Sequence, residues 1–284
     1  MKTTLQALVM ACLLFAGISS AAFAEQKKTV RLVYVEWPCA VVTTHIVKEV
    51  IEQKLGYSCE ILPVSVAVKY QSLMLGEADA TVCAWLPNTQ KTYWSKAQAT
   101  VEDLGPLVGG ARLGWTVPDY VTYTSIEDLR GKAQEFGGKI YGIDPGSEYM
   151  ETSEKAIKGY GLDGFELVEG SDAVMVAMLA DAVKNKKPVI VTGWAPHWMF
   201  GRWDLHFLDD PKGYFGTEEE IHTLVRKNLN QDMPEVYSFL DKFAFTDTKQ
   251  LQALMAENED GKDPTTIAKQ FLEKNAEQVN SWLK

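Results

Sequence analysis

Histidine and cysteine, the residues that most often bind transition metals, are scarce in this sequence. Four of each occur among 284 residues, and no two histidines have the spacing of a metal site. The sequence also lacks the G-x-S-x-G motif, a Walker-type glycine loop and the G-x-G-x-x-G motif. We therefore predict no metal, no cofactor and no catalytic residue, and the chain is not expected to be an enzyme.

The chain has fewer basic than acidic residues. The chain has 28 Lys and Arg against 38 Asp and Glu, which gives a formal net charge of −10. This balance argues against nucleic acid and against anionic membrane surfaces as partners. Beyond the N-terminal region, no segment reaches the run of about 20 apolar residues that a membrane span needs.

The first 24 residues have the pattern of a secretory signal peptide. Lys2 is followed by the apolar run 5–15, and Ala22-Phe23-Ala24 is a small-x-small cleavage site after Ala24. Cys12 follows a poor lipobox, so a lipoprotein is not expected. Cleavage removes one lysine and no acid, which changes the net charge from −10 to −11. We expect a periplasmic protein of 260 residues, a length that suits two lobes.

Strand and helix patterns alternate along the mature chain, as in an α/β fold with mainly parallel sheets. The first lobe begins with strands at 29–35, 59–64 and 80–84 and helices at 40–55 and 66–75. Residues 104–117, rich in glycine, are interpreted as the crossover to a second lobe. That lobe has strands at 139–143, 165–168 and 188–192 and helices at 148–158 and 171–183, the latter with Val174, Met178 and Leu179 on one side.

The chain is expected to return to the first lobe near residues 204–208 and to be helical thereafter. Residues 217–220 have the form of a capping box, and Asp263-Pro264 offers a helix N-cap followed by a proline. The predicted fold is a two-lobed periplasmic-binding-protein architecture with a hinge. Lobe 1 would comprise residues 25–111 and 206–284, and lobe 2 residues 112–205.

Three tryptophans share one local setting: each follows a predicted strand and precedes a proline. They are Trp37 in YVEWPCA, Trp85 in VCAWLPN and Trp194 in VTGWAPH. Ligands of open α/β sheets bind beyond the carboxyl ends of strands. Indole faces gathered there would suit a quaternary ammonium group, which attracts aromatic rings at about 0.5–2 kcal/mol per contact and donates no hydrogen bond. The alternative is that each tryptophan belongs to the core.

The other tryptophans are assigned different roles. Trp115 is either a fourth wall of this cage or a residue that packs at the hinge. Packing is expected for the remaining four: Trp94, Trp198, Trp203 and Trp282. His197, three residues after Trp194, either lines the cleft or caps a local turn.

The turn Asp144-Pro145-Gly146-Ser147 lies between a predicted strand and a predicted helix. Backbone N–H groups in the first turn of a helix have no intrahelical acceptor and form a site for anions. Glu148 and Tyr149 would supply these groups. An ordinary strand-to-helix turn is the alternative, but the turn would suit the carboxylate of a zwitterion.

The chain resembles the periplasmic substrate-binding proteins of glycine betaine and choline ABC importers. The resemblance covers nearly all of the mature chain and is carried by YVEWPCA (34–40), GEADATVCAWLPNT (76–89), GWTVPDYV (114–121), GIDPGSEYM (142–150) and GWAPHW (193–198). It implies two α/β lobes that close over the ligand about a hinge. It also implies a tryptophan prism at Trp37, Trp85 and Trp194, with carboxylate contacts from the amides of Glu148 and Tyr149.

Three positions depart from that family's patterns. Gln90 stands where betaine binders often have a histidine that contacts the carboxylate. Glu148 stands where a glycine is common, and an acid near a bound carboxylate is unfavourable unless it points away. Cys39 stands where choline binders have an acid. These changes leave the cage intact and bear on the other end of the ligand.

Three cysteines remain after cleavage: Cys39, Cys59 and Cys83. Cys39 and Cys83 each lie two residues from a cage tryptophan, so they are a candidate disulfide if their strands are neighbours. The alternative is three buried thiols.

The sequence thus predicts a monomeric extracytoplasmic protein that binds a quaternary ammonium osmolyte and delivers it to the permease of an ABC importer. Glycine betaine is the favoured ligand, with choline, carnitine or a sulfonium analogue as alternatives. A binding protein that serves a sensor, and an exported enzyme acting on quaternary amines, are the other hypotheses.

Overall fold

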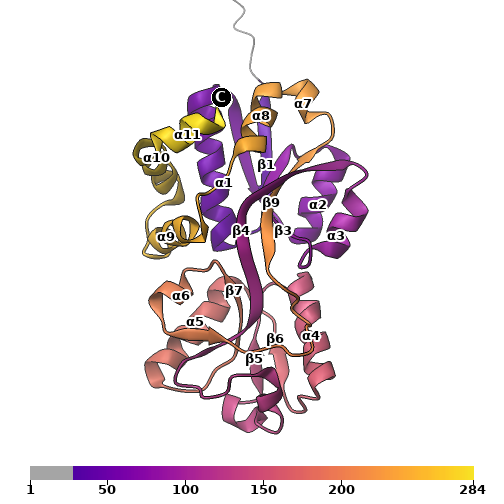
Figure 1. The fold of residues 1–284 in the computed structure, drawn as a ribbon, viewed down its shortest axis with the longest axis vertical. Coiled ribbons are helices and arrows are strands. Elements are labelled where there is room, and N and C mark those ends of the chain that lie inside the picture. The colour runs from indigo at the N-terminus through magenta and orange to yellow at the C-terminus, as the bar shows by residue number, and fades with distance from the viewer. Residues whose placement is uncertain (1–27) are drawn as a thin grey trace, which may run out of the picture.

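The computed structural model describes residues 28–284. The predicted signal peptide, with Cys12 and the cleavage site after Ala24, lies outside this range. Within it, nine strands form one mixed sheet in the order β2-β1-β3-β9-β4-β7-β5-β6, and β8 pairs with β4. No helix of residues 28–284 is long and apolar enough to cross a membrane. Figure 1 shows two lobes, one above the other, with β4 running between them.

The upper lobe is built on four strands and the first half of β4. Strands β1 and β2 pair in parallel, as do β1 and β3, whereas β9 is antiparallel to β3. The strands are β1 (Thr29–Tyr34), β2 (Ser58–Pro63), β3 (Ala80–Leu86) and β9 (Glu219–Arg226). The helices are α1 (Pro38–Val50) with its π-helical extension η1 (Ile51–Leu55), α2 (Val66–Leu75), α3 (Lys91–Ala97), α7 (Leu229–Asp232), α8 (Pro234–Lys242), α9 (Thr248–Glu259), α10 (Pro264–Lys274) and α11 (Ala276–Trp282).

The lower lobe contains the second half of β4 and four short strands. These are β5 (Lys139–Tyr141), β6 (Glu166–Val168), β7 (Val191–Ala195) and β8 (Leu205–Phe207). The helices are η2 (Ile126–Leu129), η3 (Ala133–Phe136), α4 (Glu148–Tyr160), α5 (Asp172–Asn185) and α6 (Met199–Arg202). Helices α4 and α5 are each capped by a serine. The Ser147 side chain accepts a hydrogen bond from the Met150 amide, and the Ser171 side chain accepts one from the Val174 amide.

Strand β4 (Val101–Pro118) connects the two lobes as one extended segment (Figure 1). Its partner is β9 up to Ala111, and from Arg112 its partners are β7 and β8. The register slips three times before this change, and Gly110 there has φ of +72°, a conformation open to glycine without a Cβ penalty. The segment interpreted as the crossover between the lobes is therefore a bulged strand.

Three sequence predictions about local structure were wrong. Residues 217–220 do not begin a helix, because Glu219 starts β9 and its carboxylate accepts N–H bonds from Asn88 and Thr89. The return point at 206 falls inside β8, which pairs with the lower lobe. Val174, predicted on the same side of α5 as Leu179, is 52% exposed, whereas Leu179 is buried together with Met175.

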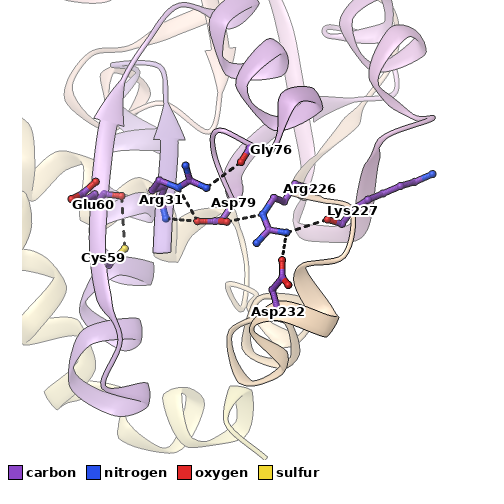
Figure 2. Close-up of polar contacts among 8 residues, drawn as sticks. All are labelled: Arg31, Cys59, Glu60, Gly76, Asp79, Arg226, Lys227 and Asp232. Carbon is purple, nitrogen blue, oxygen red and sulfur yellow. Dashed lines mark hydrogen bonds and ion pairs between the residues drawn. The ribbon is translucent and has the colours of Figure 1, made fainter. Parts of the chain in front are cut away.

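A buried carboxylate ties the upper lobe together beside the first residue of β3 (Figure 2). Asp79, just before β3, is 1% exposed and accepts bonds from the Arg31 amide at 2.7 Å and from Arg226 Nε at 2.7 Å. Arg226 also reaches Asp232 at 2.8 Å, and Arg31 donates to the Gly76 carbonyl at 3.1 Å. The Asp79 carboxylate thus links β1 to β9, and Arg31 links β1 to the end of α2.

Candidate ligand-binding pocket

A pocket lies between the lobes, at the ends of strands β1, β3 and β7. The upper lobe lines it with Trp37, Val66, Trp85, Thr89 and Gln90. The lower lobe lines it with Leu113, Ile143, Ser147, Glu148, Tyr149 and Trp194. Six of the eight predicted ligand-binding residues therefore line one pocket, and Trp115 and His197 do not.

The three tryptophans reach the pocket from three different elements. Trp37 follows β1 and is the N-cap residue of α1, Trp85 is the last but one residue of β3, and Trp194 lies near the end of β7. All three are buried. Trp37 Nε1 donates to Asp144 Oδ2 of the lower lobe at 3.3 Å. The strand-end setting recognised in the sequence thus places two indoles on one lobe and one on the other.

His197 is a support for the pocket wall and not part of its surface. Its ring meets the Trp194 ring edge to face, with centroids 4.6 Å apart. The Met199 amide donates to Nδ1 at 3.1 Å, so the ring proton must lie on Nε2, which donates to Asp172 at 3.1 Å. These bonds fix the imidazole, and through it the position of Trp194.

Trp115 is not a fourth wall. It is fully buried, its Nε1 donates to Ser153 Oγ at 3.1 Å, and its ring packs 5.6 Å from Phe215. Leu113, two residues earlier in β4, lines the pocket, whereas Trp115 is held against α4 by its bond to Ser153. Trp282 stacks on Phe271 in the C-terminal helices, far along the chain from the pocket.

The turn at 144–147 leads into α4 at the pocket. Ser147 caps the helix, accepting a bond from the Met150 amide at 3.3 Å. Glu148 and Tyr149 therefore occupy the first turn, whose N–H groups have no intrahelical acceptor. The Tyr149 hydroxyl is held by Gly114 and Gly193, 2.9 and 2.8 Å from their carbonyl oxygens. Its phenol is thus part of the scaffold, and the helix N-terminus faces the pocket.

The turn and the start of α4 also contact the upper lobe. The Thr92 amide donates to Glu148 Oε1 at 2.9 Å, and Tyr93 Oη donates to the Gly146 carbonyl at 3.0 Å. We call these two bonds, together with Trp37–Asp144, the closing contacts. Glu148 Oε2 is buried and without a partner among residues 28–284, and burial raises the pKa of this carboxyl.

A charged residue that the sequence analysis missed lies behind Gln90. Lys69 is fully buried, and its Nζ donates to the Cys83 carbonyl at 2.9 Å and to Gln90 Oε1 at 3.0 Å. Burial lowers the pKa of Lys69 to about 8. The signal was present in α2, because Lys69 shares the buried stripe of Val66, Tyr70 and Leu73 at i, i+3, i+4 and i+7 spacing.

Cys39 and Cys83 lie side by side beneath the tryptophans. Their Sγ atoms are 3.5 Å apart, and both side chains, like that of Cys59, are buried free thiols. Cys39 lies in the first turn of α1 and Cys83 in β3, against which α1 packs, but no bond joins the sulfurs in this structure. The disulfide stays a prediction.

A pocket enclosed between two α/β lobes, with the chain crossing from lobe to lobe along extended strands, defines a two-lobed solute-binding protein. Residues 28–274 match the family described as the substrate binding domain of the ABC-type glycine betaine transport system. The chain belongs to this family, whose members are extracytoplasmic binding proteins of ABC importers.

Known relatives agree with this assignment. The chain is 42% identical over 162 residues to the glycine betaine/carnitine transport binding protein GbuC of Listeria monocytogenes, a match that spans 56% of this chain and 53% of that protein. The lactococcal protein OpuAC, solved in its closed conformation with glycine betaine, is similar with a TM-score of 0.86 and 39% identity, covering 91% of this chain and 100% of that one. A choline binding protein in complex with choline has a TM-score of 0.82 and 28% identity, covering 90% and 91%.

Proposed function

We propose that this protein captures a quaternary ammonium osmolyte, with glycine betaine as the main ligand, in an aromatic cage between its lobes. The loaded protein then delivers the ligand to the permease of an ABC importer. It acts in the periplasm as a monomer, without a cofactor and without catalysing a reaction. The observation that most directly supports this proposal is that Trp37, Trp85 and Trp194 line one pocket.

The chemistry of a trimethylammonium group explains why tryptophans suit this task. The group has diffuse positive charge and only methyl surfaces, so a carboxylate cannot hold it by hydrogen bonds. Indole faces attract the charge and also cover the methyl groups, at about 0.5–2 kcal/mol per ring. Three rings thus contribute a large part of the roughly 8 kcal/mol that micromolar affinity needs.

Ligand capture is coupled to lobe closure in this proposal. Trp37 and Trp85 belong to the upper lobe and Trp194 to the lower lobe, so the cage is complete only when the lobes meet. We place the hinge at Gly110 of β4 and Gly216 before β9, which both have positive φ. This assigns residues 112–216 to the lower lobe and extends the predicted boundary by about one strand.

Relatives support a ligand of this chemical class. OpuAC was solved with glycine betaine, GbuC is named for betaine and carnitine, and a more distant relative was solved with choline. The N–H groups at the start of α4 favour a carboxylate at the far end of the ligand, because a helix N-terminus attracts anions. Glycine betaine carries both groups.

Calorimetric titration with glycine betaine, carnitine and choline tests the proposal. Trp85→Ala and Trp194→Ala should each weaken binding by about tenfold or more, since each removes a cage wall. Trp282→Ala is the matched control: it should leave affinity unchanged and cost about 3–5 kcal/mol of stability, as core aromatic truncations do. The proposal fails if no quaternary amine binds, or if the three variants lose affinity equally.

A further inference from the structure

Lys69 is a buried cation without a carboxylate partner in the described part of the chain. Its Nζ contacts are the Cys83 carbonyl and Gln90 Oε1, and burial is complete. Taking a charge out of water is costly unless an opposite charge or strong hydrogen bonds compensate. A lysine in this position therefore lowers the stability of the unliganded protein, and a methionine of similar length would fill the space without that cost.

Lys69 and Tyr70 fix the orientation of the Gln90 amide. Lys69 Nζ lies 3.0 Å and Tyr70 Oη 2.9 Å from the same amide atom. The ammonium can only donate, and burial raises the pKa of Tyr70, so its hydroxyl also keeps a proton to donate. An NH₂ group cannot accept these bonds, and the shared atom must be Oε1.

The other amide atom, Nε2, can donate hydrogen bonds but has no acceptor among the described residues. Gln90 is 2% exposed and lines the pocket, and within residues 28–284 its Nε2 has no hydrogen-bond partner. A buried donor without an acceptor costs about 1–3 kcal/mol. A ligand that brings an acceptor into the pocket removes that cost, and an anionic acceptor gains most.

We propose that Lys69 is a positioning residue which, through Gln90, makes the pocket select quaternary amines with a carboxylate over those with a neutral hydroxyl. The inference rests on the proposed function and specifies a carboxylate as the group at the far end of the ligand. Lys69 holds Gln90 with Nε2 toward the ligand and polarises the amide, so Nε2 is a stronger donor. The chain thereby supplies positive charge behind the glutamine.

The same charge disfavours a ligand that is a net cation. Lys69 Nζ lies 6.0 Å from the centroid of the Trp37 ring, so the ammonium is close to the cage. Two like charges at such distances repel in a buried site, where screening by water is weak. A zwitterion compensates, because its carboxylate lies between its own cation and Gln90. Choline offers no such compensation.

The test compares glycine betaine with choline in the Lys69→Met variant, using calorimetry. Betaine binding should weaken by about tenfold or more, the loss expected when a charged group leaves a hydrogen-bond network. Choline binding should be unchanged or tighter. Tyr70→Phe is the control that removes one bond to Oε1 and keeps the charge, and it should cost only a few-fold in betaine affinity.

Two further outcomes keep the test decisive. If Lys69→Met does not fold, Gln90→Glu replaces the donor with an acceptor beside Lys69, and should abolish the preference for betaine while choline still binds. Equal losses for both ligands in either variant, or unchanged selectivity, would overturn the role of Lys69. Failure of the wild-type protein to bind any quaternary amine would instead overturn the proposed function.

A pH profile provides a readout that a purely structural lysine would not change. Because the pKa of Lys69 is lowered to about 8, the preference for betaine over choline should decline above that pH and be flat in Lys69→Met. The other titratable groups nearby are Tyr70 and Glu148, whose pKa values are raised. In reduced protein they also include Cys39, whose pKa is raised, and Cys83, whose pKa is lowered chiefly by its bond with Cys39. Cys83→Ala should keep the profile. A profile that survives in Lys69→Met would contradict the proposal.

Discussion

One of the closing contacts, between Tyr93 and Gly146, should affect the affinity for every ligand by the same factor. Tyr93 Oη donates to the Gly146 carbonyl across the cleft, and Tyr93 does not line the pocket. Tyr93→Phe removes this bond and leaves the cage unaltered. Because the bond joins the two lobes, its loss should disfavour the closed state and leave each lobe intact.

The size of the effect follows from one half-buried hydrogen bond. A neutral hydrogen bond contributes about 0.5–1.5 kcal/mol net, and partial exposure of Tyr93 places it toward the lower end. At 1.4 kcal/mol per factor of ten, Kd should rise by about two- to fivefold. Glu148→Gln weakens the charge-assisted bond from the Thr92 amide at 2.9 Å and should have an effect of similar size.

Stopped-flow tryptophan fluorescence with glycine betaine and with choline is the appropriate assay. The change should appear mainly in the dissociation rate, since closure retains a ligand that has already entered. In Tyr93→Phe both ligands should be affected by the same factor, because Tyr93 does not line the pocket. Trp282→Ala is the control, with rates unchanged.

The reasoning would be refuted if Tyr93→Phe left both dissociation rates unchanged, or altered one ligand alone. For Glu148→Gln, tighter betaine binding would mean that the acid opposes the ligand carboxylate, as its sequence position suggested. Slower dissociation of betaine alone would indicate the same. In that case Glu148 would belong to the ligand site and not to lobe closure.

Three further predictions concern stability and covalent state. Asp79→Asn should destabilise the protein by about 3 kcal/mol, because it breaks the buried ion pair with Arg226 (Figure 2). The Tm should fall while betaine affinity stays unchanged, since Asp79 does not line the pocket. A loss of affinity would contradict this placement. Cys39 and Cys83 should be oxidised in periplasmic protein, with reduction lowering stability by about 4 kcal/mol for a separation of 44 residues. One reactive thiol, Cys59, is then expected in denatured, unreduced protein, and three would exclude the bond. Trp115→Phe should lose about 1 kcal/mol with its bond to Ser153 and keep full affinity, whereas a weaker Kd would return Trp115 to the cage.

Local patterns in the sequence were sufficient for most elements of the fold. Helix α2 was predicted at its observed bounds, and Asp263 caps α10 with Pro264 in its first turn, as expected. These features depend on neighbouring residues alone: caps, glycine ends and apolar periodicity. The strand-end tryptophans could be recognised for the same reason.

Failures occurred where a distant segment decided the structure. Residues 217–220 have a good capping sequence, yet Glu219 bonds the amides of Asn88 and Thr89, which lie about 130 positions earlier in the chain. No strand was predicted for the glycine-rich crossover segment 104–117, but pairing with β9 and then β7 makes residues 101–118 a strand. Backbone hydrogen bonds to such partners override local preference.

The sequence by itself thus predicted the class of ligand: three tryptophans at strand ends favour a trimethylated cation, because the chemistry of the indole face is contained in the residue type and its position. Only the tertiary structure shows which residues surround Gln90 and Glu148, where we propose that the polar end of the ligand lies. Lys69 lies 21 positions before Gln90 and Thr92 lies 56 before Glu148, so neither partner could be read from local spacing. Folding placed the buried charge of Lys69 behind Gln90 and brought Thr92 of the upper lobe into contact with Glu148. Such packing, unlike helix capping, depends on contacts between distant segments.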